Sequence, residues 1–109
     1  MGQISVGDVV FVHFPFSDLT ASKKRPALVL AVLPRDDLIL CQITSRSYAD
    51  TNAVKIQDED FSSGALLKVS YIRPGKLFTA NMSIVDKVVA RLKVATHQSV
   101  VLQVIRLIS

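Results

Sequence analysis

The fold is decided by the stretch from residue 25 to residue 33, Arg25-Pro26-Ala27-Leu28-Val29-Leu30-Ala31-Val32-Leu33. From Ala27 onward it is continuously apolar, which is typical of a strand buried on both faces. Pro34 ends the run, and Pro26, which has no backbone N–H, suits the first position of a strand. The polar segment 17–24 precedes it. We therefore expect a buried strand over 27–33 that is entered from a polar loop.

Other short β-rich runs flank this strand and are separated by polar turns. They predict strands at 9–14, 38–44, 53–56 and 66–72 and a short one at 76–79, with an acidic stretch at 57–64 between two of them. The segment 84–92 fits a helix or a strand, and its β-branched content favours a strand. Thr96 is a good N-cap for a C-terminal helix with apolar residues at helical spacing. The pattern predicts a mainly β protein with a C-terminal helix, as a small barrel or sandwich.

Composition bounds the class of protein. A chain of 109 residues fits one domain, predicted to span 1–109. Half of its residues are hydrophobic and 20% are charged, so a packed core is expected. No apolar run approaches the ~20 residues of a membrane-spanning helix, and a secretory signal is lacking, so we expect a cytoplasmic protein. The single cysteine, Cys41, is expected to be a buried packing residue.

The charge balance bears on partners. A net charge of +4 and a pI near 9.5 favour nucleic acid or another acidic partner. The two histidines and one cysteine show no metal-ligand spacing. The expected chemistry, if any, therefore uses neither a metal nor a cofactor.

Arg25 is the first candidate for that chemistry. Pro26 biases it toward an extended backbone, so its guanidinium is presented from the rim of a rigid element, after a basic loop that contains Lys23 and Lys24. A phosphate site needs such a fork of donors on a firm support. The alternative is a solvated arginine at the start of a strand.

The end of the 38–44 strand carries a second candidate. Ile39, Cys41 and Ile43 share one apolar face, so Thr44 points the opposite way and its hydroxyl could meet a ligand. Ser45 falls on the core face, and hydroxyl clusters at strand ends are otherwise usual turn formers.

A third segment is Ser70-Tyr71-Ile72-Arg73-Pro74-Gly75-Lys76. Arg73 also precedes a proline and is biased to extended geometry, and the default prediction is a turn that ends a strand. Tyr71 could stack a base. Because the chain has two tyrosines and no tryptophan, no aromatic platform is predicted.

Two residues are candidates for a general base. His13 lies in the first strand, on the face of Phe11, and its ordinary pKa suits this role, although a lone histidine among apolar residues is more often structural. Asp18, in the loop before Arg25, is the other candidate. His97, near the start of the predicted helix, is expected at the surface.

Together these segments resemble the MazF/PemK family of toxins from type II toxin–antitoxin systems. The resemblance rests on Gly7-Asp8-Val9-Val10-Phe11-Val12-His13-Phe14-Pro15-Phe16-Ser17-Asp18, Lys24-Arg25-Pro26-Ala27-Leu28-Val29-Leu30, Gln42-Ile43-Thr44-Ser45 and Ser70-Tyr71-Ile72-Arg73-Pro74-Gly75-Lys76-Leu77. These segments occur in the family's order from about residue 7 to the C-terminal helix.

The resemblance implies an SH3-like small β-barrel of the CcdB/MazF/PemK type, a homodimer, and metal-independent, sequence-selective cleavage of single-stranded RNA through attack by the ribose 2′-hydroxyl. It assigns active-site roles to Arg25 and Thr44 and implies a cognate antitoxin as partner. Candidate RNA-binding residues are Lys23, Lys24, Ser45, Arg46, Arg73 and Lys76. Family members often have a carboxylate where this chain has His13, and an aspartate where it has Gly75.

Three alternatives differ in function. The chain could be a catalytically inactive relative that binds RNA or a protein through the same groove. It could resemble the gyrase-poisoning toxins that share this barrel, or it could be a plain nucleic-acid adaptor.

Overall fold

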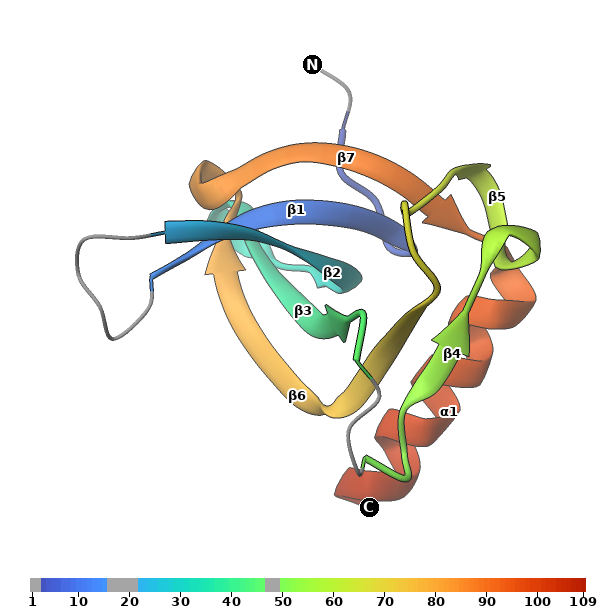
Figure 1. Cartoon of the computed structure of the whole chain (residues 1–109). Helices are drawn as coiled ribbons and strands as arrows, with labels where there is room; N and C mark the ends of the chain where they lie inside the picture. The colour runs from blue at the N-terminus through green and yellow to red at the C-terminus, as the bar shows by residue number, and fades with distance from the viewer. Residues whose placement is uncertain (1–2, 16–21, 47–49) are drawn as a thin grey trace.

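Most of the chain forms one antiparallel sheet that curls on itself and carries a helix along one side (Figure 1). The computed structural model describes residues 3–15, 22–46 and 50–109. In this part of the chain the strands lie in the order β4-β6-β3-β2-β1-β7-β5. Their bounds are β1 Asp8–Pro15, β2 Ser22–Val32, β3 Asp37–Thr44, β4 Val54–Ile56, β5 Phe61–Gly64, β6 Ser70–Asn81 and β7 Val85–Leu92, followed by the helix α1, Val94–Ile108.

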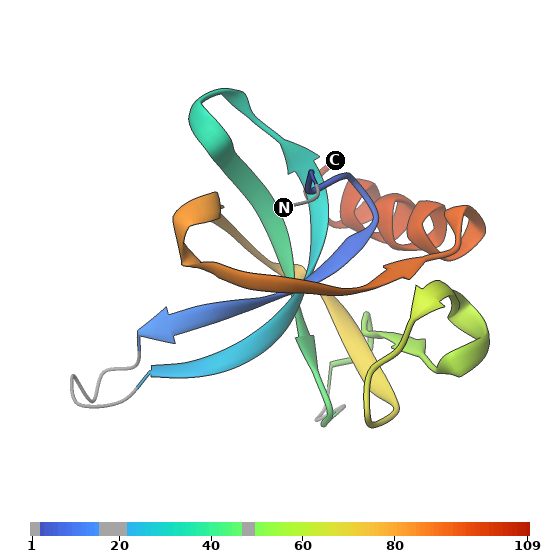
Figure 2. The same ribbon diagram turned by 90° about the horizontal axis from the view of Figure 1, so that it is seen from above.

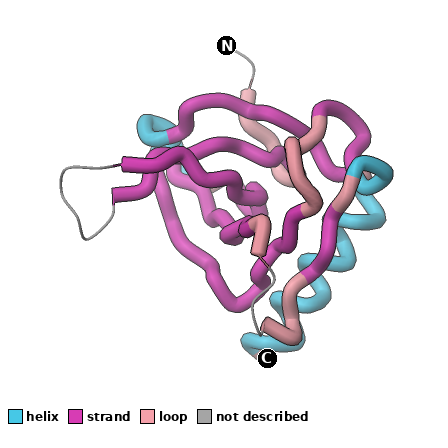
Figure 3. The backbone as a smooth tube through the Cα atoms, viewed as in Figure 1, coloured by secondary structure: helices cyan, strands magenta, loops and turns pink. Residues whose placement is uncertain are grey.

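Short 3-10 helices make three of the connections, at Pro34–Asp36, Asp58–Asp60 and Met82–Ile84. Figure 3 shows how the strands wind around one another while the C-terminal helix stays outside the sheet. The mainly β architecture with a C-terminal helix is confirmed, and so are strands close to 9–14, 38–44, 53–56 and 84–92.

The central strands β1, β2 and β3 are buried on both faces, because apolar side chains alternate into two separate cores. The helix-side core contains Val9, Leu28, Cys41, Ile43, Ile56, Phe61, Ile72, Ala90, Leu92 and Val100 of α1. The second core contains Val10, Val12, Ala27, Val29, Leu38, Leu40 and Ala80. Each fully buried valine or leucine stabilises the fold by roughly 1.5–3 kcal/mol. The burial predicted for Cys41 is confirmed.

The start of β2 differs from the prediction. The strand begins at Ser22, so Pro26 is an interior residue and Lys24 belongs to the strand rather than to a loop. Backbone pairing with β1 explains the difference, since the register runs from Val12↔Arg25 through His13↔Lys24 to Pro15↔Ser22. A hairpin partner supplies hydrogen bonds to a polar segment whose own composition does not favour a strand.

The predicted turn at Arg73 is also wrong, because the two strands expected at 66–72 and 76–79 are one strand, β6. Its pairing with β3 shifts register between Cys41↔Leu77 and Ile43↔Ile72. Residues 73–76 therefore form a bulge opposite Gln42, and a bulge accommodates a proline that a regular ladder would not. Residues 66–69 lie outside any strand, and the acidic stretch 57–64 contains the short strand β5.

The start of α1 also differs from the prediction. Lys93 is the residue before the helix, and Thr96 lies inside its first turn, where its hydroxyl pairs with Asp60 Oδ1 at 3.4 Å. His97, expected at the surface, is only partly exposed, and its Nδ1 is buried without a hydrogen-bond partner among the described residues. Burial and the nearby Arg91 lower the pKa of this imidazole.

Gly64 is required at the end of β5. Its φ is +66°, and a Cβ at this position would overlap the backbone carbonyl oxygen of Val89 in the neighbouring strand. We expect Gly64→Ala to lower the free energy of unfolding by about 2 kcal/mol or more, because left-handed strain adds to the overlap. The adjacent exposed residue supplies the control, Ser63→Ala. Equal denaturation midpoints for the two variants would contradict this role of Gly64.

Candidate functional site

Arg25 and Thr44 lie on the same face of the sheet, just beyond the point where the adjacent strands β2 and β3 stop pairing with each other. The ladder between β2 and β3 stops at Ala27↔Gln42. Proline has no backbone N–H, so the next residue, Pro26, has no hydrogen to donate and the ladder does not continue. Arg25 in β2 and Thr44 in β3 each lie two residues beyond this last pair. Because side chains alternate along a strand, both point to the same face as Ala27 and Gln42. Figure 2 shows β2 and β3 diverging beyond this point.

Both side chains keep partial exposure to solvent. The Oγ1 of Thr44 accepts a hydrogen bond of 3.2 Å from the backbone N–H of Arg46. A hydroxyl has one hydrogen to donate as well as its acceptor positions. The turn that follows β3 therefore orients the Thr44 hydroxyl while its hydrogen remains available for a ligand.

His13 belongs to a different cluster. It lies directly opposite Lys24, which places both on the face opposite to Arg25. Asp86 of β7 joins them, with Oδ2 at 3.2 Å from Lys24 Nζ and Oδ1 at 3.9 Å from His13 Nε2. Asp86 occupies a register shift between β1 and β7, and such a bulge re-aims a side chain. Nothing in the local sequence around Asp86 indicates this role.

Arg73 is held inside the bulge of β6. Its Nε donates to Asp50 Oδ2 at 2.9 Å, and both side chains are largely buried. The thiol of Cys41 donates to the Arg73 backbone carbonyl at 2.9 Å. Burial raises the pKa of this thiol to about 12, so it stays protonated and is a structural donor rather than a nucleophile.

The remaining predicted residues are less constrained. Ser45, Arg46 and Lys76 are exposed, the first two directly after β3 and the third in the bulge of β6. Lys23 lies in β2 beside Lys24, and its side chain is outside the described residues, as is the whole of Asp18. The structure thus brings Arg25 and Thr44 to one face and separates them from His13 and Lys24.

The Gly7-Asp8 motif has a structural role. Asp8 is 5% exposed, accepts from the backbone N–H of Ser5 through Oδ2, and pairs through Oδ1 with Arg91 Nη1 at 2.8 Å. A buried carboxylate of this kind needs such partners. Asp8 therefore fixes the N-terminal segment to β7.

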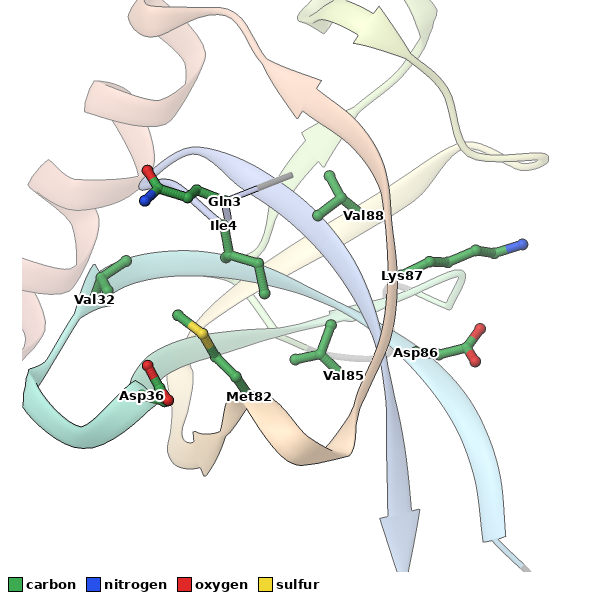
Figure 4. A pocket seen from close by; sticks show the side chains of 9 residues that line it. All are labelled: Gln3, Ile4, Val32, Asp36, Met82, Val85, Asp86, Lys87 and Val88. Atoms are coloured by element: carbon green, nitrogen blue, oxygen red, sulfur yellow. The ribbon is translucent and has the colours of Figure 1, made fainter. Parts of the chain in front are cut away.

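A pocket of about 480 Å³ lies at the edge of the second core, lined by Gln3, Ile4, Val32, Asp36, Met82, Val85, Asp86, Lys87 and Val88. Its walls are mainly apolar, and Figure 4 shows Asp86 and Lys87 pointing away from it. The described residues contain no group of three or more His, Cys, Asp or Glu side chains that could hold a metal ion. In the same part of the chain, no helix is long and apolar enough to cross a membrane.

The curled antiparallel sheet with a C-terminal helix is a small SH3-like barrel that matches the fold of solved MazF structures. The chain belongs to the family of PemK-like, MazF-like toxins of type II toxin–antitoxin systems, whose model matches residues 5–108. No curated protein sequence matches it significantly.

Solved structures share the fold at low sequence identity. A MazE–MazF crystal structure from Deinococcus radiodurans has a TM-score of 0.76 at 18% identity, over 95% of this chain and 94% of that one. An endoribonuclease in complex with its cognate antitoxin, from a mycobacterial species, has a TM-score of 0.72 at 13% identity, over 97% and 93%. Mycobacterium tuberculosis toxin MazF-mt6 has a TM-score of 0.69 at 16% identity, over 89% and 91%.

The Asp50–Arg73 pair makes stability depend on pH. The hydrogen bond from Arg73 lowers the pKa of Asp50 below its ordinary value of 3.8, with a further contribution from the backbone N–H of Asn52. A carboxylate with a lowered folded-state pKa stabilises the fold above its unfolded pKa, and this contribution is lost as the pH falls through the folded value. We expect Asp50→Asn to be less stable than wild type at neutral pH, with the difference shrinking below about pH 4.

Denaturation midpoints across this pH range test the expectation. Asp58→Asn, which changes an exposed carboxylate, is the control and should leave the pH dependence nearly unchanged. A stability difference between Asp50→Asn and wild type that stays constant down to pH 3 would rule out the proposed linkage.

Proposed function

We propose that this chain is a metal-independent endoribonuclease that cleaves single-stranded RNA at selected sequences and acts as the toxin of a toxin–antitoxin pair. The observation that carries the proposal is the common face of Arg25 and Thr44, which lie just beyond the last pair of the β2–β3 ladder, Ala27↔Gln42. These are the two positions to which the family resemblance assigns the active site. Membership of the MazF-like toxin family supports the reaction class.

The proposed reaction is a transfer within the RNA chain. The ribose 2′-oxygen forms a bond to the adjacent phosphorus, and the bond from phosphorus to the 5′-oxygen breaks. A base takes the proton of the 2′-hydroxyl, and a proton is delivered to the departing 5′-oxygen, which leaves a cyclic phosphate and a 5′-hydroxyl end. Negative charge grows on the phosphoryl oxygens, and the Arg25 guanidinium stabilises it with charge-assisted hydrogen bonds.

Thr44 orients the reacting group. Because its Oγ1 already accepts from the backbone N–H of Arg46, its hydrogen points to the remaining side and donates to the phosphate. His13 and Asp18 remain the candidate bases. His13 lies with Lys24 and Asp86, so it reaches the scissile nucleotide only if the RNA passes over the end of the β1–β2 hairpin.

The proposed partners follow from the family. The chain acts as a homodimer in the cytoplasm, and a cognate antitoxin covers the site. Two of the similar structures are complexes with an antitoxin, the MazE–MazF structure and the mycobacterial endoribonuclease. The excess of basic residues in this chain suits both an RNA backbone and an acidic antitoxin segment.

Removal of the Arg25 guanidinium is the sharpest test of the catalytic role. We expect Arg25→Ala to lower the rate of RNA cleavage on the order of a hundredfold or more, because one preorganised donor to the developing charge is lost. Cleavage of a single-stranded RNA under single-turnover conditions measures this. Arg106→Ala is the matched control, since Arg106 is exposed in the last turn of α1. Wild-type cleavage by a folded Arg25→Ala protein would overturn the mechanism.

The 2′-hydroxyl provides an independent test of the reaction. Sequencing of the 5′ ends made from a long unstructured RNA identifies the cleavage sites, and a 2′-deoxy nucleotide is then placed at one of them. We expect that single substitution to abolish cleavage at its own site alone, because the nucleophile is missing, and we expect EDTA to leave the rate unchanged. Loss of cleavage in EDTA would refute metal independence. Absence of all cleavage would favour an inactive binding module or a gyrase-poisoning toxin.

A further inference from the structure

Thr44 is one end of a row of side chains that crosses three neighbouring strands. It lies directly opposite Tyr71 of β6, and Tyr71 lies directly opposite Lys55 of β4. Directly opposed residues of an antiparallel pair point to the same side, with Cβ atoms about 4.5–5.5 Å apart. Thr44, Tyr71 and Lys55 are therefore contiguous on one face, which is also the face of Arg25.

This face is distinct from the helix-side core. The residues next to the row, Ile43, Ile72 and Ile56, point the other way and pack in the core that includes Val100 of α1. The row itself keeps contact with solvent, since Lys55 is exposed and Thr44 and Tyr71 are partly exposed. The second core contains no residue of β4 and no residue of β6 before Phe78, so it does not cover the row.

The composition of the row matches single-stranded nucleic acid. An aromatic ring provides a surface on which a base stacks, and flanking cations hold the phosphates on either side. The chain has few aromatic residues, so no extended aromatic platform was predicted. One ring is enough to stack one base, and the register places the Tyr71 ring between the hydroxyl of Thr44 and the lysine Lys55.

We propose that the Thr44–Tyr71–Lys55 row is the path of the RNA beside the scissile phosphate, with a base stacked on the Tyr71 ring and the next phosphate bound by Lys55. The proposal rests on the proposed ribonuclease function and adds two substrate-binding residues to it. Stacking accepts every base, so Tyr71 contributes affinity and leaves the choice of cleavage sequence to other contacts.

Four variants test the row: Tyr71→Phe, Tyr71→Leu, Lys55→Gln and, as control, Lys87→Gln on β7 at the distant pocket. Two quantities are measured for each, the KM and kcat of RNA cleavage and the binding of a random-sequence single-stranded DNA that carries 2-aminopurine. The DNA lacks the 2′-hydroxyl but retains bases and phosphates, so its binding does not depend on catalysis. Quenching of 2-aminopurine fluorescence reports stacking directly.

We expect Tyr71→Leu to raise KM and the dissociation constant of the DNA by about 5- to 100-fold, with kcat and the cleavage sequences nearly unchanged and the quenching lost. Tyr71→Phe keeps the ring and should behave as wild type. Lys55→Gln should weaken binding and reduce the slope of log affinity against log salt by about one. Lys87→Gln should alter none of these values.

The outcomes separate this proposal from the proposed function. If wild type cleaves RNA while folded Tyr71→Leu and Lys55→Gln match the control in both assays, the row is wrong and the ribonuclease stands. Equal losses for Tyr71→Phe and Tyr71→Leu would place the effect in the hydroxyl and overturn stacking. If wild type leaves RNA intact but binds the DNA with the expected dependence on Tyr71, the ribonuclease function is wrong, and the row binds single-stranded nucleic acid without lying beside a scissile phosphate.

Discussion

Burial of β1, β2 and β3 on both faces is the constraint on which the rest of the structure depends. Along most of their length, both alternating sets of side chains must be apolar, because one set enters the helix-side core and the other enters the second core. Polar groups can therefore emerge only where a strand runs beyond both cores. Arg25, Lys24 and His13 emerge at the far end of the β1–β2 hairpin, and Thr44 emerges at the end of β3. The candidate site lies where the two cores end.

Interruptions of the ladders then decide which polar groups meet. The missing N–H of Pro26 separates β2 from β3 just before Arg25, and the bulge of β6 brings Arg73 to Asp50. A third interruption, between β1 and β7, turns Asp86 toward Lys24. Each irregularity costs backbone hydrogen bonds, and each places a charged side chain that a regular sheet would direct elsewhere.

The sequence predicted those strands that can be recognised from their own residues, without knowledge of the partner strand. Alternation identified β1 and β3 and placed Thr44 opposite to Cys41, and β-branched content identified β7. The start of β2 was missed because its polar residues are strand only through pairing with β1. The continuity of β6 through Pro74 was missed because a bulge depends on the partner strand. The candidate site followed the same rule: Arg25 and Thr44 could be proposed individually from the sequence, whereas Asp86 and Lys55 acquire neighbours only through register, which no local pattern encodes.

The opposition of Thr44, Tyr71 and Lys55 has a consequence for how such a chain can change over time. Side chains in a strand alternate with a period of two, so the loss or gain of one residue within β4 or β6 would turn one member of the row toward the core and bring an isoleucine to the surface. Length changes are tolerable in the connection between β5 and β6, outside any strand. Divergence of these toxins should therefore proceed by substitution within the row and by insertion beside it, with strand lengths preserved while the loops vary.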